Sequence, residues 1–365
     1  MGSSHPDYGR VMLDIFSGKD PGMILWQPRI DFWYSVNKVR GTLPEHMKDF
    51  SLLDLYDYCH ASIRYFVDPL RVQYSNHVQI TRQDLDEKFY RLTWETPVGS
   101  LTEVLHYDDY RLSAYNSEYR LKTADDFRIL EYIRQNETWY WDQESYVRDI
   151  NRIGRLGMAQ FYFRRSPVQG LFIENMGFGN AILFMHDYPD VVERYIEVCT
   201  EADEGMYAVL CKSPTPMMNF GENIDAYMDP PTIWRKHLIQ YYRRRDAQLK
   251  AAGKFTHIHI DGAMKRLLHE INESPFDGIE ACTPLPQGDV TIAEIKMALG
   301  DKVLLDGIPA VYFMDTFSFE DIRSCVGELV DTFYPRLVLG ISDELPPNAD
   351  IERVRMVGEM LQDLI

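Results

Sequence analysis

Residues 255–262 read Phe-Thr-His-Ile-His-Ile-Asp-Gly, and this stretch carries the clearest indication of the fold. Its period of two predicts a β-strand over residues 255–260, because successive side chains of a strand point to opposite faces. A segment of helical period follows at 263–272. A strand followed by a helix is the unit from which parallel sheets are built, so this stretch predicts a βα unit.

The same alternation of short apolar runs and helical segments continues from about residue 213 to the end of the sequence. Further strands are predicted at 216–221, 278–281, 303–307 and 337–340, and helices at 231–251, 292–299, 319–332 and 351–364. Repeated βα units predict an α/β fold, and we expect a (β/α)8 TIM barrel.

The first half of the sequence is less regular. It predicts an N-terminal helical extension, an early barrel strand at 24–27 and helices at 124–134 and 189–210. Strand-like residues 88–95 and 101–107 flank Thr96-Pro97-Val98-Gly99, which predicts an inserted β-hairpin. No linker rich in Gly, Pro or Ser divides the sequence, so a single barrel domain over residues 1–365 is expected.

Composition excludes several classes of partner. The formal net charge of −18 opposes binding to nucleic acid, which requires Lys and Arg to displace counterions from the phosphates. No apolar run approaches the roughly 20 residues needed to cross a bilayer. The five cysteines are scattered and odd in number, unlike a disulfide framework. We therefore expect a cytoplasmic protein that binds neither nucleic acid nor membrane.

Polar side chains on the strand at 255–260 are the strongest candidates for chemistry. His257, His259 and Asp261 share one face, and Ile258 and Ile260 share the other. In a barrel, the isoleucine face packs against the outer helices, and the polar face points inward near the carboxyl ends of the strands, where substrates bind. His259 and Asp261 are accordingly predicted catalytic residues.

Neighbouring strands add two further donors to this predicted site. Cys282 follows the strand at 278–281, and Glu222 follows the strand at 216–221. Imidazole, thiolate and carboxylate groups together suit zinc with an open coordination position. We predict His257, His259, Cys282 and Glu222 as metal ligands, with Glu222 also catalytic. The alternative is structural, since buried histidines can bond core carbonyls and a buried cysteine commonly fills space.

Several short strings, in order along nearly the whole sequence, resemble the uroporphyrinogen decarboxylase superfamily, and in particular its branch of cobalamin-related zinc methyltransferases. The strings are Thr96-Pro97-Val98-Gly99, Ser166-Pro167, Gly221-Glu222-Asn223, His259-Ile260-Asp261-Gly262, Gly300-Asp301-Lys302-Val303, Asp306-Gly307-Ile308 and Gly340-Ile341-Ser342-Asp343. This resemblance implies a TIM barrel and an enzyme.

Departures from the patterns of that superfamily narrow the implied function. Decarboxylases of the superfamily carry an Arg-rich N-terminal motif for the porphyrinogen carboxylates, whereas only Arg29 stands here. Thiol-activating methyltransferases carry cysteines where this sequence has His259 and, nearby, Ser342. The resemblance then implies an O-demethylase-like methyltransferase that moves a methyl group from a small methoxylated or N-methylated compound to a corrinoid protein. No Asp-x-His-x-x-Gly corrinoid motif is present, so cobalamin would arrive on that separate protein.

The mechanism expected from the sequence uses zinc as a Lewis acid on the ether oxygen or amine of the methyl donor. Asp261 would orient a ligand or donate a proton. Two alternatives remain open. One is a metal-free decarboxylase or lyase with Asp261 and His259 as acid and base, and the other is a non-catalytic binding barrel.

Overall fold

The computed structural model describes residues 6–362, which pack as two compact units. The first unit comprises Met1–Pro69, Gln143–Phe163 and Thr215–Ile365, and the second comprises Leu70–Asp142 and Arg164–Pro214. The chain therefore leaves the first unit twice and returns to it. The single domain expected from the sequence stays a prediction.

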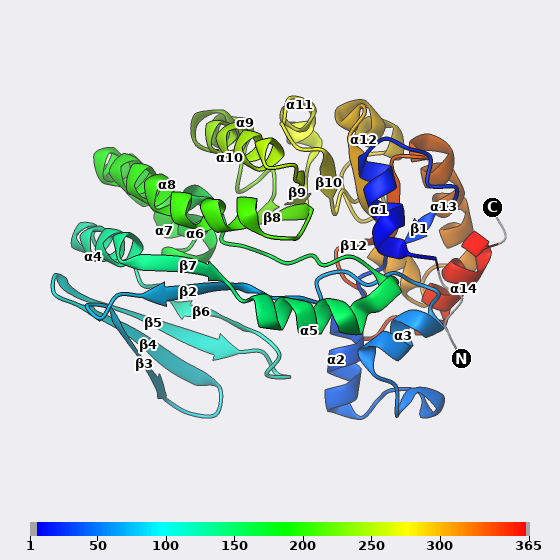
Figure 1. Cartoon of the computed structure of the whole chain (residues 1–365), viewed down its shortest axis with the longest axis horizontal. Coiled ribbons are helices and arrows are strands. Elements are labelled where there is room, and N and C mark those ends of the chain that lie inside the picture. Colours follow the sequence, from blue (N-terminus) through cyan, green and yellow to red (C-terminus); the bar gives the residue numbers. More distant parts are fainter. Residues whose placement is uncertain (1–5, 363–365) are drawn as a thin grey trace. The chain divides into compact units, whose positions relative to one another are not determined.

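A parallel sheet forms the centre of the first unit (Figure 1). Within residues 6–362 it has six strands in the order β1-β12-β11-β10-β9-β8. They are β1 (Leu25–Trp26), β8 (Met217–Ile224), β9 (Phe255–Ile260), β10 (Gly278–Glu280), β11 (Val303–Pro309) and β12 (Leu337–Ser342). All six overlap strands predicted from the sequence, so the α/β class with a parallel sheet is confirmed.

Two short segments lie between the outer strands of this sheet. The backbone N–H of Ser62 donates to the carbonyl of Trp26 in β1 at 2.7 Å, and Ile63 forms a parallel bridge with Gly157. Tyr162 forms a parallel bridge with Asn219 in β8. Backbone pairing therefore runs from β1 through 62–63 and 157–162 to β8.

Helices follow the parallel strands, as the sequence predicts. The first unit contains α1 (Tyr8–Phe16), α2 (Asp31–Arg40), α3 (Leu52–Tyr58), α5 (Gln143–Ile153), α9 (Pro231–Ile233), α10 (Ile239–Ala251), α11 (Leu268–Asn272), α12 (Ile292–Leu299), α13 (Phe319–Phe333) and α14 (Ile351–Gln362). A π turn at Trp234–Leu238 joins α9 to α10. The predicted helix at 351–364 is confirmed to residue 362, and its last two residues lie outside the described residues.

The first unit buries an apolar core on one side of the sheet. Met12 and Ile15 of α1 are fully buried against Leu25, Val303 and Val338 of the parallel strands. These five side chains expose none of their surface, so each contributes roughly 1.5–3 kcal/mol of transfer free energy to folding. This core fixes the strands whose carboxyl ends carry the polar residues described below.

Antiparallel strands and helices make up the second unit. One sheet contains β3 (Gln79–Asp84), β4 (Phe89–Thr96), β5 (Gly99–Tyr107) and β6 (Ala114–Glu118), and β2 (Leu70–Tyr74) pairs with β7 (Glu137–Trp141). The helices are α4 (Ala124–Gln135), α6 (Pro167–Gly170), α7 (Phe178–Asp187) and α8 (Pro189–Lys212). The predicted hairpin is confirmed as β4 and β5, whereas β2, β3, β6 and β7 were not predicted.

No helix within residues 6–362 combines the length and the apolar character that a membrane crossing requires.

Candidate active site

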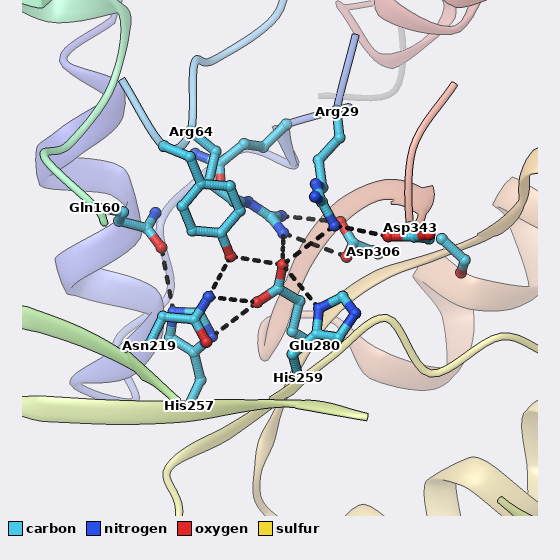
Figure 2. A network of polar contacts seen from close by, with 12 residues as sticks. Arg29, Arg64, Gln160, Asn219, His257, His259, Glu280, Asp306 and Asp343 are labelled. Carbon is cyan, nitrogen blue, oxygen red and sulfur yellow. Dashed lines mark hydrogen bonds and ion pairs between the residues drawn. The ribbon is translucent and has the colours of Figure 1, made fainter. Parts of the chain in front are cut away.

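Glu280, the last residue of β10, lies at the centre of a buried polar cluster in the first unit (Figure 2). Its carboxylate accepts hydrogen bonds from Nη1 of Arg64 at 3.0 Å, from the hydroxyl of Tyr65 at 2.5 Å and from Nδ2 of Asn219 at 3.0 Å. Burial raises the pKa of Glu280, but the contacts with His257, His259 and Arg64 outweigh burial and hold this pKa well below its usual range. Glu280 is therefore an anion at neutral pH.

Both histidines of β9 face this carboxylate. The parallel register places His257 beside Gly278 and His259 beside Glu280. Nδ1 of His257 lies 3.3 Å from Oε2 of Glu280, and Nδ1 of His259 lies 3.6 Å from Oε1. The shared polar face predicted from the alternation in residues 255–260 is thus confirmed.

His259 is held between two carboxylates. Its Nε2 lies 3.7 Å from Oδ2 of Asp261, which is too long for a hydrogen bond. Within residues 6–362, neither ring nitrogen of this buried histidine has a hydrogen-bond partner. Burial lowers the pKa of His259, but Asp261 and Glu280 together raise it to about 10. The ring is therefore an imidazolium at neutral pH, and its N–H groups have no hydrogen-bond acceptor among the described residues.

His257 differs from His259 in charge. Its Nε2 lies 3.2 Å from Oε1 of Gln160, and Nδ1 faces Glu280. Complete burial lowers the pKa of His257 despite the nearby carboxylate. One buried imidazole of the pair is thus neutral and the other charged, which avoids placing two like charges side by side.

Arg64 is the cationic partner of the cluster, and no pattern in the sequence singles it out. It is fully buried, and its Nη2 donates to Oδ1 of Asp306 at 2.9 Å while its Nε donates to Oε1 of Gln27 at 2.8 Å. Burial raises the pKa of Asp306 to about 6, although Arg64 opposes the shift. Arg64 therefore links β10 and β11 through Glu280 and Asp306.

Arg29 occupies the more open side of the cluster. It donates to Asp343 at 2.9 Å and to Glu344 at 2.8 Å, and its Nη1 lies 4.0 Å from Glu280. Of the described residues in this cluster, three are cations (Arg29, Arg64 and His259) and five carry carboxyl groups (Asp261, Glu280, Asp306, Asp343 and Glu344). Its positive charges are therefore already compensated.

Backbone strain marks the same region of the parallel strands. Asn223, Ala281, Asp306 and Asp343 have φ angles of 55°, 65°, 80° and 65°. These left-handed conformations are uncommon for residues other than glycine and cost of order 1–3 kcal/mol each. Such outliers cluster at functional sites, where the surrounding structure holds them, so the backbone and the side chains point to the same location.

Comparison with known proteins gives the family. The model of the family described as Uroporphyrinogen decarboxylase (URO-D) matches residues 171–364, just over half of the chain. The chain belongs to this family. None of the curated proteins compared with it matches in sequence. The family match covers β8 to β12, and therefore His257, His259 and Glu280.

Among solved structures, this URO-D family member is similar in fold to a methyltransferase from Methanosarcina mazei. The TM-score is 0.59 at 11% sequence identity, over 97% of this chain and 98% of that chain. It is also similar, with a TM-score of 0.40 and 11% identity over 94% of this chain and 96% of the other, to a protein from Listeria monocytogenes described as a vitamin-B12 independent methionine synthase. At these identities, the first likeness shows the fold alone.

The structure does not bring Glu222 to the histidines. On β8, Asn219 reaches Glu280, whereas Glu222 accepts a hydrogen bond from the hydroxyl of Tyr242 in α10 at 3.1 Å. β8 is irregular between Phe220 and Ile224, where its register against β9 shifts, so regular alternation does not bring Glu222 to the face of Asn219. The expectation that Glu222 lies at the mouth beside His259 is corrected accordingly.

Cys282, the other zinc ligand expected from a neighbouring strand, does not follow the regular alternation of β10. Ala281 ends β10 in a left-handed conformation, so the alternation that would place Cys282 on the face of Glu280 is interrupted. The thiol is fully buried, and burial, followed by the charge of Asp306, raises its pKa. In the chain by itself, Cys282 is therefore a protonated thiol.

The residues present do not offer the expected metal site. Within residues 6–362, no group of three or more His, Cys, Asp or Glu side chains is arranged to hold a metal ion. Of the four predicted ligands, the structure brings together His257 and His259 alone, and both face Glu280. Zinc binding stays a prediction from the sequence.

Gly340 of β12 leaves room for the Arg64–Asp306 pair. A Cβ atom at this position would lie 2.5 Å from Oδ1 of Asp306 and 2.8 Å from the carbonyl oxygen of Gln27. We expect Gly340→Ala to lower the free energy of unfolding by about 1–3 kcal/mol, because the backbone of Gln27 and the side chain of Asp306 must both shift. Urea unfolding measures the change.

Gly327 within α13 provides the matched control, since a Cβ added there meets no atom within 4 Å. Gly327→Ala should stabilise the protein by about 0.5–1 kcal/mol, because alanine loses less backbone entropy in a helix. Equal effects of the two substitutions would contradict the tight packing inferred at Gly340.

The charge of His259 makes stability depend on pH. Its pKa is about 10 in the folded protein and near 6.5 when unfolded. The charged form of His259 therefore stabilises the folded protein fully below about pH 6.5, and this stabilisation is lost as pH rises through about 10. We expect the free energy of unfolding to fall over this window in the wild type and to fall less in His259→Gln. If urea unfolding showed the same pH dependence for the wild type and for His259→Gln, the assignment of the charge to His259 would be contradicted.

Proposed function

We propose that this URO-D family member is an enzyme that moves a methyl group from a small methoxylated or N-methylated compound to a corrinoid held by a separate protein. One observation carries the proposal: a buried, charged imidazole, His259, has an N–H without a hydrogen-bond partner at the carboxyl end of a parallel strand. The likeness in fold to a methyltransferase supports the choice of reaction.

In this proposal, His259 acts on the leaving atom of the methyl donor. Its Nε2–H donates a proton to the ether oxygen as the C–O bond breaks, so that the demethylated product leaves as a neutral alcohol or phenol. Glu280 on the Nδ1 side and Asp261 near Nε2 keep the ring charged and oriented. An O-methyl donor gains most from this acid, because an alkoxide is a poor leaving group.

A cobalamin on the partner protein would supply the nucleophile that accepts the methyl group. The compensated charges of Arg29 and Arg64 fit a small neutral or cationic donor better than a polycarboxylate. This is a physical reason to disfavour porphyrinogen decarboxylation, because each guanidinium already has carboxylate partners within the chain.

We further infer that the parallel sheet belongs to a closed (β/α)8 barrel. The backbone pairing of 62–63 with β1, of Ile63 with Gly157, and of Tyr162 with β8 supports this closure. These two segments would be the second and third of eight strands. The polar cluster around Glu280 then lies inside the barrel at the carboxyl ends of its strands, where TIM-barrel enzymes hold their active sites.

Metal analysis of the purified protein tests the zinc predicted from the sequence. Because Glu222 bonds Tyr242, and because no three His, Cys, Asp or Glu side chains within residues 6–362 are grouped to hold a metal ion, we expect zinc well below one ion per chain. One zinc per chain, with loss of most of it in Cys282→Ser, would instead restore the predicted site of His257, His259, Cys282 and Glu222.

A second candidate is favoured by the pairing of His259 with Asp261, which places an acid beside a base. A metal-free decarboxylase or lyase would use these two groups, and a release of CO2 from carboxylic acids without any corrinoid would identify it. A non-catalytic binding barrel would show neither activity.

The deciding experiment is a screen of methoxylated and N-methylated compounds with cob(I)alamin as acceptor. Conversion is followed in the visible spectrum, and the demethylated product is identified by mass spectrometry. We expect at least one donor to be demethylated by the wild type. If no donor were demethylated and the protein released CO2 from a carboxylic acid, methyl transfer would be rejected and the lyase reaction accepted.

A further inference from the structure

An exposed aromatic ring, that of Tyr162, lies beside the buried Glu280 cluster of the first unit. Tyr162 forms a parallel bridge with Asn219 of β8, whose side chain reaches Glu280 (Figure 2). Tyr162 is 42% exposed, whereas Asn219 is 1% and Glu280 0% exposed. Ligand sites commonly combine aromatic side chains with a few buried polar groups, so Tyr162 is a candidate for ligand contact.

The ring of Tyr162 is stacked on the ring of Tyr65. The two ring centroids are 4.4 Å apart, and the ring planes are inclined by 27°. Stacking of this kind holds the plane of a ring. Because Tyr65 covers one face of Tyr162, the exposed surface of Tyr162 lies away from that face and is open to a second ring.

Tyr65 is itself held in place by polar contacts. Its hydroxyl donates to Oε1 of Glu280 at 2.5 Å and accepts from Nδ2 of Asn219 at 2.6 Å. The guanidinium of Arg29 lies 5.5 Å from the centroid of its ring, within the range of a cation–π contact. The ring on which Tyr162 stacks is therefore positioned before any ligand binds.

Gly221 of β8 provides the space that Tyr162 occupies. A Cβ atom at residue 221 would lie 2.3 Å from Cδ1 and 2.8 Å from Cε1 of Tyr162. Both distances are well below the ~3.5–4.0 Å of a favourable carbon–carbon contact. Any side chain at residue 221 would therefore displace the ring of Tyr162 from its position against the strand.

The aromatic stack and the proposed acid meet at one oxygen atom. Oε1 of Glu280 accepts the hydrogen bond of Tyr65 and lies 3.6 Å from Nδ1 of His259. The stack of Tyr65 with Tyr162 and the ring of His259 therefore flank the same carboxylate. A ligand ring that stacks on Tyr162 would be held close to the carboxylate that orients His259.

We propose that Tyr162 determines the substrate class of this site by stacking on the ring of an aryl methyl ether, an inference that rests on the proposed function. Stacked aromatic pairs contribute binding free energy beyond the area that they bury, which an aliphatic ether cannot gain. The methyl group passes to the corrinoid of the separate protein. The electron pair of the broken C–O bond stays on the phenolic oxygen, which takes the proton of His259, and a phenol leaves.

Binding measurements without any corrinoid test the stack independently of methyl transfer. Calorimetric titration of the full chain compares phenol with cyclohexanol, which has a hydroxyl group and a similar size but no aromatic ring. We expect phenol to bind about three- to tenfold more tightly than cyclohexanol, the usual contribution of a stacked pair.

Tyr162→Leu removes the ring and keeps an apolar side chain, whereas Tyr162→Phe keeps the ring. We expect the preference for phenol to disappear in Tyr162→Leu and to remain in Tyr162→Phe. Gly221→Ala, which displaces the ring without removing it, should also weaken this preference. Tyr140→Leu is the matched control, because Tyr140 is 48% exposed and lies in β7 of the second unit, and it should bind phenol like the wild type.

Kinetics with methoxybenzene and methoxycyclohexane then separate binding from chemistry. Tyr162→Leu should raise KM for methoxybenzene and leave kcat/KM for methoxycyclohexane within about twofold, because the lost contact serves binding of the ring alone. Phenol binding that depends on Tyr162, without turnover of any donor, would reject methyl transfer and keep Tyr162 as the residue that selects an aromatic ligand. The inference is overturned if the wild type binds phenol no more tightly than cyclohexanol, or if Tyr162→Leu keeps the wild-type preference.

Discussion

Replacing His259 by glutamine is expected to lower kcat for demethylation by about 10²–10⁴-fold, the usual contribution of a positioned general acid. Glutamine keeps the polar character of the site, but it cannot protonate a leaving oxygen. The expectation rests on the position of the ring between Glu280 and Asp261 and on its unpartnered N–H. Steady-state kinetics with the donor found in the screen measures the change.

His186→Gln is the control for this prediction, because the side chain of His186 is 88% exposed and lies in α7 of the second unit. It should leave kcat unchanged. The pH profile separates catalysis from structure: wild-type kcat should fall as pH rises through about 10, where His259 loses its proton. If His259→Gln kept the wild-type kcat, His259 would not be the acid.

Glu280→Gln is expected to have the largest effect on stability. The fully buried carboxylate accepts hydrogen bonds from Arg64, Tyr65 and Asn219 and faces two imidazoles. Removing its charge leaves buried cations with fewer anionic partners, which typically costs about 3–5 kcal/mol. Urea unfolding at pH 7 measures this loss in the free energy of unfolding.

A matched substitution at the surface shows whether burial is the cause. Glu359 pairs with Arg355 on α14 and is 47% exposed, so Glu359→Gln should change the free energy of unfolding by less than about 1 kcal/mol. Glu280→Gln should also lower the pKa of His259, which NMR titration of the ring can follow. If both variants lost similar amounts of free energy of unfolding, the buried contacts of Glu280 would not stabilise the protein more than a surface ion pair does.

The sequence predicts the part of the fold in which local pattern and tertiary environment agree. β9 begins and ends at the predicted residues 255 and 260, and α12 at the predicted 292 and 299. Strands buried on both faces and capped helices leave a local signal that a single sequence carries. The second unit gave a weaker signal, because the exposed residues of β3 lack apolar alternation.

Only the part of the candidate site that lies on a single strand could be predicted from the sequence. His257, His259 and Asp261 follow from the alternation within residues 255–261, and the structure brings all three to one polar cluster. Arg64 leaves no such signal, because 216 residues separate it from its partner Glu280 in the chain. The sequence does not single out Glu280 as a candidate residue either.

The sequence by itself therefore determined the α/β class, the order of the parallel strands along the chain and the polar face of β9. Only the tertiary structure decided which carboxylate faces the histidines, and it is Glu280 rather than Glu222. The physical reason is that periodicity fixes the face of a side chain within its own strand. The partner across the sheet depends on register and on local breaks such as the left-handed Ala281, which no local pattern encodes.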